Sequence, residues 1–212
     1  MHKSDSQYFS QSPAAESKPV SISYALKLNG SCENINFIGD NGVFSKRRVD
    51  YGTDLLIRSL PPLSGRILDL GCGYGVAGIS AALLNPNAEV WFSDVNARAI
   101  GLCRENYRRI VQLVNPGARD ARIIQSDGFE NFPDAEFDAI ITNPPVRAGK
   151  AVLFGLYGGA FRRLKAAGAF FAVIQRKQGM ESTRAELARL FGNCEDFARK
   201  SGFHVLRAVR RD

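Results

Sequence analysis

Short apolar runs alternate with helical patterns along most of this chain, and this alternation restricts the fold more than any other feature. Runs of strand length occupy residues 66–70, 89–94, 121–127, 137–143 and 169–175, and two more lie within 196–209. Helical patterns separate them, over residues 76–84, 96–113, 151–164 and 182–191. Strands that alternate with helices predict an α/β fold, with a mostly parallel, doubly wound sheet covered on both faces.

The first sixty residues follow a different pattern. Residues 1–19 are polar and rich in Ser, Gln and Pro, which is typical of a flexible arm, although they include Tyr8 and Phe9. Residues 20–28 and 33–38 alternate around an Asn-Gly pair and predict a β-hairpin. A helix over 52–60 stops at two prolines. We therefore expect an arm (1–19), a hairpin with a linker helix (20–60) and one α/β domain (61–212).

Composition narrows the class of partner. With 28 Lys and Arg against 21 Asp and Glu, the net charge of +7 favours a polyanion such as nucleic acid, although solubility alone also explains such a charge. The 4 cysteines form no C-x-x-C pair, so neither a zinc site nor a disulfide framework is indicated. The arm lacks the apolar run of a signal peptide, and no later stretch approaches the ~18 apolar residues of a membrane span. We expect a cytoplasmic protein, monomeric and without metal.

A glycine-rich turn follows the strand at 66–70 and opens a helix, where backbone can approach a ligand closely. Counted from Gly71, the dinucleotide pattern G-x-G-x-x-G is incomplete, because Val76 then stands where its third glycine belongs. Asp69 ends the strand before Gly71 and would repel a pyrophosphate but attract an ammonium or a sulfonium. Asp94 ends the next strand, where it can accept both ribose hydroxyls, and Asp127 ends the third, where it can reach an adenine amine.

These motifs resemble those of the class I S-adenosylmethionine-dependent methyltransferases. The closer resemblance is to the small-methyltransferase-domain family, which includes bacterial guanine-N2 methyltransferases of small-subunit ribosomal RNA. It is carried by "YFSQSP", "DNGVFSKRRVDYGTDLL", "ILDLGCGYGVAGI", "SDVNARA", "SDGF", "NPPVRAGK" and "VIQRKQG". The resemblance implies a Rossmann-like, seven-stranded sheet with the hairpin as an appendage, and S-adenosylmethionine as the cofactor. The cofactor contacts that it implies are Asp69, Gly71, Gly73, Asp94, Val95, Asp127, Gly128 and Asn143, with Phe44 and Thr53 closing over the ligand.

The resemblance also gives a role to the turn at the end of the fourth strand. In such enzymes the Asn side-chain oxygen and the carbonyl that follows accept the two hydrogens of an exocyclic amine, which turns the nitrogen lone pair toward the methyl group. Asn143, Pro144 and Pro145 are therefore the expected catalytic residues, acting by orientation and electrostatics. No strong base is needed, and the only histidines, His2 and His204, lie far from this motif in sequence. Val146 stands where related amine methyltransferases often carry an aromatic residue, so a stacking ring must come from Phe44, Tyr8 or Phe9.

Basic residues gather at the ends of adjacent strands, where they can hold the phosphates that flank a presented base. They are Arg147, Lys150, Arg176 and Lys177, and Lys46 joins them from just before the helix over 52–60. The sequence thus favours a methyltransferase acting on the N2 amine of a guanine in 16S ribosomal RNA, free or in the small subunit. Two alternatives stay open: a protein-glutamine methyltransferase of the release-factor type, and an RNA-binding module that keeps the fold without the chemistry.

Overall fold

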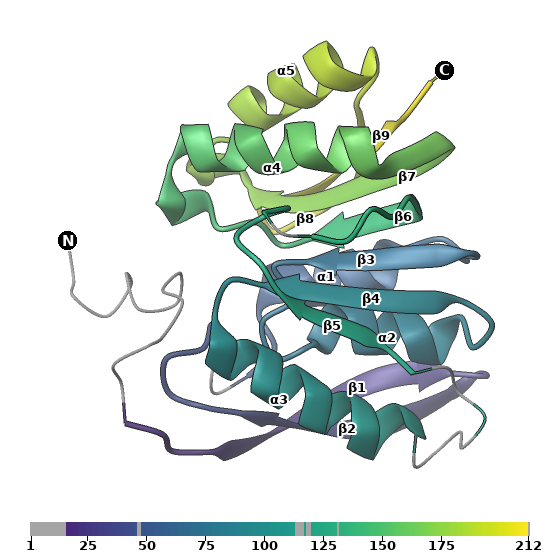
Figure 1. Ribbon diagram of the computed structural model, residues 1–212, viewed down its shortest axis with the longest axis vertical. Helices are drawn as coiled ribbons and strands as arrows, with labels where there is room; N and C mark the ends of the chain where they lie inside the picture. Colours follow the sequence, from purple (N-terminus) through teal and green to yellow (C-terminus); the bar gives the residue numbers. More distant parts are fainter. Residues whose placement is uncertain (1–15, 46–47, 113–116, 118–119, 131, 212) are drawn as a thin grey trace.

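The computed structural model describes residues 16–45, 48–112, 117, 120–130 and 132–211 of the chain. Most of the predicted arm, with His2, Tyr8 and Phe9, lies outside these ranges, and so does Lys46. The described residues form a central sheet with helices on both faces and a hairpin beyond one helical layer (Figure 1).

Seven strands form the central sheet in the order β5-β4-β3-β6-β7-β9-β8. The parallel strands are β3 (Arg66–Leu70), β4 (Glu89–Asp94), β5 (Arg122–Gln125), β6 (Phe137–Thr142) and β7 (Leu164–Gln175). β9 (Phe203–Val209) runs antiparallel to β7, and β8 (Glu195–Lys200) antiparallel to β9. The direction of winding reverses between β3 and β6, which is where doubly wound sheets bind their ligands. The predicted fold class is confirmed.

Helices cover the two faces of the sheet, as the alternation of strands and helices predicts. One face packs against α1 (Tyr51–Ser59), α2 (Val76–Leu84) and α3 (Ala97–Tyr107), and the other against α4 (Lys150–Arg163) and α5 (Met180–Phe191) (Figure 1). Along β3, Ile67 joins the apolar cluster under α1–α3, whereas Leu68 and Leu70 join the cluster under α4 and α5. Because side chains alternate along a strand, Asp69 lies on the same face as Ile67, toward α2.

The hairpin pairs β1 (Val20–Leu28) with β2 (Ser31–Gly39) through a two-residue turn. Asn29 and Gly30 have φ angles of 48° and 88°, as a type I′ turn requires, and β2 therefore begins two residues earlier than predicted. Asn106 of α3 anchors the hairpin. Its amide donates to the Ile38 carbonyl and accepts from the Ile38 N–H, and it also donates to the carbonyl of Tyr74 in the glycine-rich turn.

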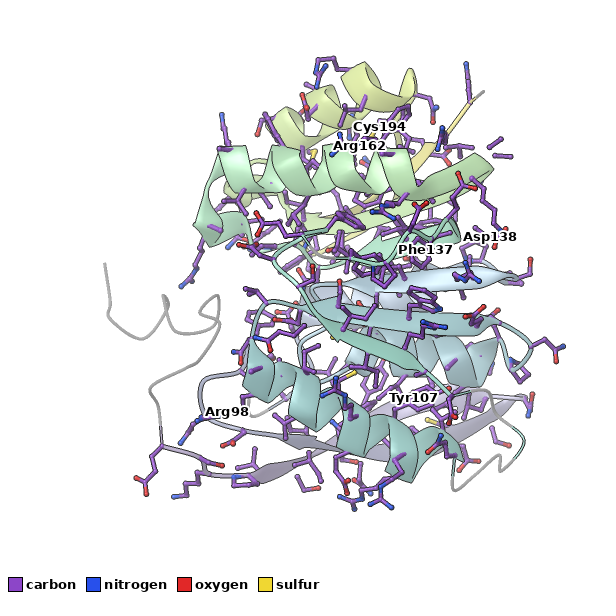
Figure 2. The ribbon with its side chains drawn as sticks, in the orientation of Figure 1. Arg98, Tyr107, Phe137, Asp138, Arg162 and Cys194 are labelled. Atoms are coloured by element: carbon purple, nitrogen blue, oxygen red, sulfur yellow. The ribbon has the colours of Figure 1, made fainter. Side chains whose placement is uncertain are left out.

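Two boundaries differ from the sequence predictions. The helix predicted over 96–113 changes after Tyr107 into a π-helical turn, η1 (Arg108–Gln112). β7 begins at Leu164, directly after α4, and its pairing with β6 shifts register after Phe137. The Asp138 carboxylate accepts from the Arg66 N–H and from Lys165 Nζ at this amino-terminal edge of the sheet, where Figure 2 labels it beside Phe137.

Candidate active site

The carboxyl ends of the parallel strands surround a cavity of about 580 Å³, a size suited to a nucleoside cofactor. Its wall contains most residues that the sequence singled out. The predicted residues that line it are Phe44, Thr53, Asp69, Gly71, Gly73, Asp94, Val95, Asp127, Gly128, Asn143, Pro144, Pro145 and Arg147. Lys150, Arg176 and Lys177 do not line the cavity. They are exposed, and each lies within two residues in sequence of a residue that lines it.

The glycine-rich turn after β3 forms part of the cavity wall. The sequence predicts the cofactor on this side of the cavity, here called the cofactor side. Gly71 and Gly73 have φ angles of 72° and 55°, and a Cβ atom at either position would point into open space. The N–H of Gly71 donates to the Ser93 carbonyl at 2.8 Å, so the turn is fixed to the end of β4. These glycines leave the backbone bare on the side that a ligand approaches.

Gly78 is a residue of this site that the sequence analysis missed. Its N–H donates to Asp69 Oδ2 at 2.7 Å, and an added Cβ would lie 2.3 Å from Phe92 Cε1 and 2.9 Å from Asp69 Cβ. The close contact of α2 with β3 and β4 therefore requires glycine here. The pattern G-x-G-x-x-G is in fact complete when counted from Gly73, with Gly75, the left-handed N-cap of α2, as its second glycine and Gly78 as its third, so the count from Gly71 was wrong.

Two carboxylates, the buried Asp69 and the half-buried Asp94, line the cofactor side of the cavity. Asp94 Oδ2 accepts from the Gly73 N–H at 2.8 Å, and its Oδ1 accepts from the Asn96 N–H at 2.9 Å. Burial raises the pKa of Asp94. Burial, together with the nearby Asp94 charge, raises the pKa of Asp69 to about 7, although the Gly78 N–H opposes the shift. A cationic ligand would relieve this cost and a pyrophosphate would add to it, so the electrostatics favour the former.

The loop after β5 completes this side of the cavity. The Ser126 N–H donates to the Asp94 carbonyl at 3.0 Å, and the Ser126 hydroxyl donates to the carbonyls of Gly128 and Glu130. These bonds hold the backbone so that Asp127 is exposed at the cavity wall and Gly128 adopts a φ of 56°.

The Asn143 side chain is held in one orientation at the end of β6. Its Nδ2 donates to Asp50 Oδ2 and to Thr53 Oγ1, both at 3.0 Å. Both amide hydrogens are thereby used, and no described residue donates to Oδ1. The amide consequently offers its oxygen, an acceptor, to a ligand. Thr53, expected to close over the cofactor, contributes its hydroxyl to this orientation.

The two prolines fix the carbonyl that follows. The Val146 N–H donates to the Pro144 carbonyl at 2.8 Å, and Pro145 has φ −75° and ψ 71°, which are the angles of an inverse γ-turn. The proline ring restricts φ at the centre of this turn. The Pro144 carbonyl therefore has a set direction beside the Asn143 amide, and it keeps a second lone pair for a donor.

The part of the cavity around the N-P-P turn, where the sequence predicts the methyl-accepting amine, is here called the acceptor side. It contains residues that the sequence analysis did not find. Phe203, Gln175 and Gln178 line the cavity, and the β7–β9 register pairs Gln175 with Phe203. The Phe203 ring lies 5.4 Å from that of Tyr51, centroid to centroid. Phe203 begins a strand sixty residues after the N-P-P motif, and no motif or spacing marks it. Phe44, one of the three candidates for a stacking ring, lines the cavity and is 48% exposed.

Basic side chains lie around the acceptor side. Arg147, Lys150, Arg176 and Lys177 are all exposed. The Arg176 N–H donates to the Gly202 carbonyl at 2.8 Å, which places the turn between β8 and β9 beside Arg176. This turn adds Lys200, which is also exposed. This group of five side chains, here called the basic rim, therefore draws on three segments of the chain.

The described residues offer no histidine base, reactive thiolate or metal site in the cavity. His204 pairs through Nδ1 with Asp196 Oδ2 at 2.9 Å, across β8 and β9. Cys72 lines the cavity, but burial and the neighbouring Cys103 thiol raise its pKa, so the thiolate is disfavoured. Among the described residues no cluster of three or more His, Cys, Asp or Glu could hold a metal ion. None of the described helices is long and apolar enough to cross a bilayer.

Two curated proteins are similar to this chain over most of its length. The chain is 38% identical over 206 residues to the uncharacterized protein YbxB of Bacillus subtilis, covering 96% of this chain and 98% of that one. It is 36% identical over 176 residues to the ribosomal RNA large subunit methyltransferase G of Streptomyces avermitilis, covering 80% of this chain but 44% of that protein.

Among the solved structures that are similar to this chain is a complex with a cofactor and a nucleoside. The T. thermophilus 16S rRNA N2 G1207 methyltransferase RsmC, in complex with AdoMet and guanosine, superposes with a TM-score of 0.75 at 25% identity. The match covers 94% of this chain and 52% of that one, so this chain spans about half the length of these ribosomal RNA methyltransferases. The model of the methyltransferase small domain matches residues 34–207, and the protein belongs to this family of S-adenosylmethionine-dependent methyltransferases.

Proposed function

We propose that this protein transfers a methyl group from S-adenosylmethionine to the exocyclic N2 amine of a guanine in 16S ribosomal RNA. The observation that carries the proposal is the orientation of Asn143. Its amide hydrogens are bonded to Asp50 and Thr53, and its oxygen is left as an acceptor beside the Pro144 carbonyl. Two adjacent acceptors are what an amine with two N–H groups requires.

The cofactor side of the cavity fits the cofactor of the family. The Asp94 carboxylate suits the ribose hydroxyls, and Asp69 supplies negative charge for the cationic methionine part. Gly71 and Gly73 leave room for the ligand where a side chain would fill the space. S-adenosylmethionine supplies, when bound, a methyl group activated by a sulfonium.

Residues on the acceptor side of the cavity orient the guanine amine. Asn143 Oδ1 and the Pro144 carbonyl accept one N–H each, and the nitrogen lone pair then points to the cofactor side. The N–C bond forms as the S–C bond breaks, and the methylated amine loses its proton to water. Preorganised polar groups of this kind are each worth about a hundredfold or more in rate.

The basic rim supports a nucleic-acid substrate. Its five cations lie around the acceptor side, where they can contact phosphates on either side of a base turned into the cavity. The choice of guanine N2 and of 16S RNA is supported by the T. thermophilus protein, which acts on N2 of G1207 in 16S rRNA. The Streptomyces relative is named for the large subunit, which gives the same reaction on 23S RNA as a second candidate.

The deciding experiment measures transfer of tritiated methyl groups. Ribosomal RNA, free and in subunits, is taken from cells that lack this protein, and the labelled nucleoside is identified by mass mapping. We expect N2-methylguanosine in 16S RNA. Label in 23S RNA would move the site to the other subunit, and label in release-factor protein would replace the proposal by glutamine methylation.

A matched variant tests the mechanism in the same assay. Asn143→Ala should lower turnover at least about a hundredfold, the scale of one lost preorganised group. Its affinity for S-adenosylmethionine should fall much less, because the amide acts on the acceptor. Full turnover by this variant would refute the proposed mechanism.

A further inference from the structure

Asp50 is a carboxylate on the acceptor side of the cavity that the proposed reaction does not use on the substrate. It lines the cavity and is the N-cap of α1. Its Oδ2 accepts from Asn143 Nδ2 at 3.0 Å and from the Thr53 N–H at 3.2 Å. One oxygen therefore serves both structural contacts.

The second oxygen of Asp50 has no such duty. No described residue donates a hydrogen bond to Oδ1. Gly52 keeps this corner open, since an added Cβ would lie 3.0 Å from Asp50 Oδ2 and 3.1 Å from Phe203 Cδ1. The Asp50 carboxylate thus contacts the Asn143 amide and lies near the Phe203 ring, and all three residues line the part of the cavity that would receive a base.

The chemistry of the bases makes this position selective. Guanine carries a donor, N1–H, next to its exocyclic amine. Adenine and cytosine carry an acceptor nitrogen there instead. A carboxylate oxygen beside the amine-binding amide accepts a hydrogen bond from the first arrangement and repels the lone pair of the second.

We propose that Asp50 is a specificity-determining residue, whose Oδ1 accepts the N1–H of guanine while Oδ2 holds Asn143 in place. This inference rests on the proposed function and assigns to one residue the selection of guanine among amine-bearing bases. The three acceptors, Asp50 Oδ1, Asn143 Oδ1 and the Pro144 carbonyl, would match in order the three N–H bonds along that edge of guanine.

The test compares two nucleosides that share a 2-amine but differ at N1, a donor in one and an acceptor in the other, and at C6, where 2-aminopurine lacks the oxygen of guanine. 2-Aminopurine riboside has the 2-amine of guanosine but an acceptor at N1, and its fluorescence reports binding directly. Guanosine is measured by competition, with S-adenosylhomocysteine present throughout. Wild-type protein should bind guanosine at least about tenfold more tightly, because a carboxylate oxygen facing a lone pair is strongly disfavoured.

Asp50→Asn then separates specificity from support. The amide oxygen of the variant can still accept from Asn143 and Thr53, and asparagine is a good N-cap, but its NH2 group faces N1 as a donor. We expect the preference for guanosine to disappear or invert, with affinity for S-adenosylmethionine unchanged. Asp54→Asn, on the same helix but outside the cavity wall, is the matched control and should keep the wild-type preference.

The outcomes are distinct. A wild-type protein without preference between the two nucleosides would overturn the inference, and so would an Asp50→Asn protein that keeps the wild-type ratio. The wild-type comparison decides even if the variant fails to fold. Binding of neither nucleoside would overturn the inference together with the proposed function, whereas methylation of N2 with no role of Asp50 would leave that function standing.

Discussion

The affinity for S-adenosylmethionine should depend on pH through Asp69, because a cationic ligand binds best when this carboxyl group is ionised. Burial raises the pKa of Asp69 to about 7, so the proton must leave before the favourable interaction forms. At about one unit below this pKa only roughly a tenth of the protein is ionised, and at about one unit above nearly all of it is. The dissociation constant should therefore fall about tenfold between about pH 6 and pH 8, or about 1.4 kcal/mol.

Calorimetric titration of the wild type and of Asp69→Asn measures this effect. The variant keeps an acceptor for the Gly78 N–H but cannot ionise, and any titration of the ligand itself remains in its curve. The difference between the two proteins should carry the tenfold change. Titrations in buffers of different ionisation enthalpy should also show release of nearly one proton per ligand at about pH 6. Parallel curves for the two proteins, without proton release, would refute this account.

The same pKa has a consequence for the ligand-free protein. The folded state binds the Asp69 proton more tightly than the unfolded state, so this contribution to stability is complete below the unfolded pKa near 3.8. It is lost as pH rises through the folded pKa of about 7. Thermal unfolding of the ligand-free wild type should show this loss, and Asp69→Asn should not.

Three further predictions concern the rest of the site. Asp94→Ala removes the carboxylate proposed to accept two ribose hydrogen bonds and should weaken S-adenosylmethionine binding by roughly 2 to 4 kcal/mol in calorimetry; unchanged affinity would contradict the assignment. Gly78→Ala places a Cβ 2.3 Å from Phe92 Cε1 and should cost at least about 3 kcal/mol in denaturant unfolding, whereas Gly101→Ala, with open space around it, should not destabilise the protein. Neutralising one cation of the basic rim should flatten the slope of log RNA affinity against log salt by about 0.7 to 0.9 without changing cofactor affinity; an unchanged slope in the variant lacking Arg147, Lys150, Arg176 and Lys177 would place the RNA elsewhere.

The sheet and its helices could be predicted because each depends on local sequence. Apolar runs of strand length and the helical pattern at 76–84 give β3, β4, β6 and α2 within a residue or so. The start of β7 could not be predicted, because pairing with β6 at Phe137, rather than any local pattern, brings Leu164 into the sheet. The π-helical turn after Tyr107 likewise has no signature in the sequence.

The candidate site divides along the same line. The acids at successive strand ends could be found, since parallel strands bring their carboxyl ends to one edge. The contact of Asp50 with Asn143 spans 93 positions and depends on how α1 packs against β7 and β9, so no spacing rule reveals it. Phe203 enters the cavity only because β9 runs antiparallel to β7, which a pattern of apolar residues does not distinguish from a parallel strand.

The two sides of the cavity are encoded very differently, and this has a consequence for how such a protein can diversify. Most of the proposed cofactor contacts, those from Asp69 to Gly128, lie on one continuous stretch of chain that includes β3, β4 and β5, while Phe44, Thr53 and Asn143 lie outside it. The acceptor side is assembled from Asp50, Asn143, Gln175 and Phe203, which come from four separate elements or their ends. A substitution, insertion or exchange of segment at any one of these four can alter the acceptor pocket without touching the stretch that holds the cofactor. The acceptor specificity can therefore change through substitutions at a few separate positions, whereas cofactor binding depends mainly on the single stretch from Asp69 to Gly128.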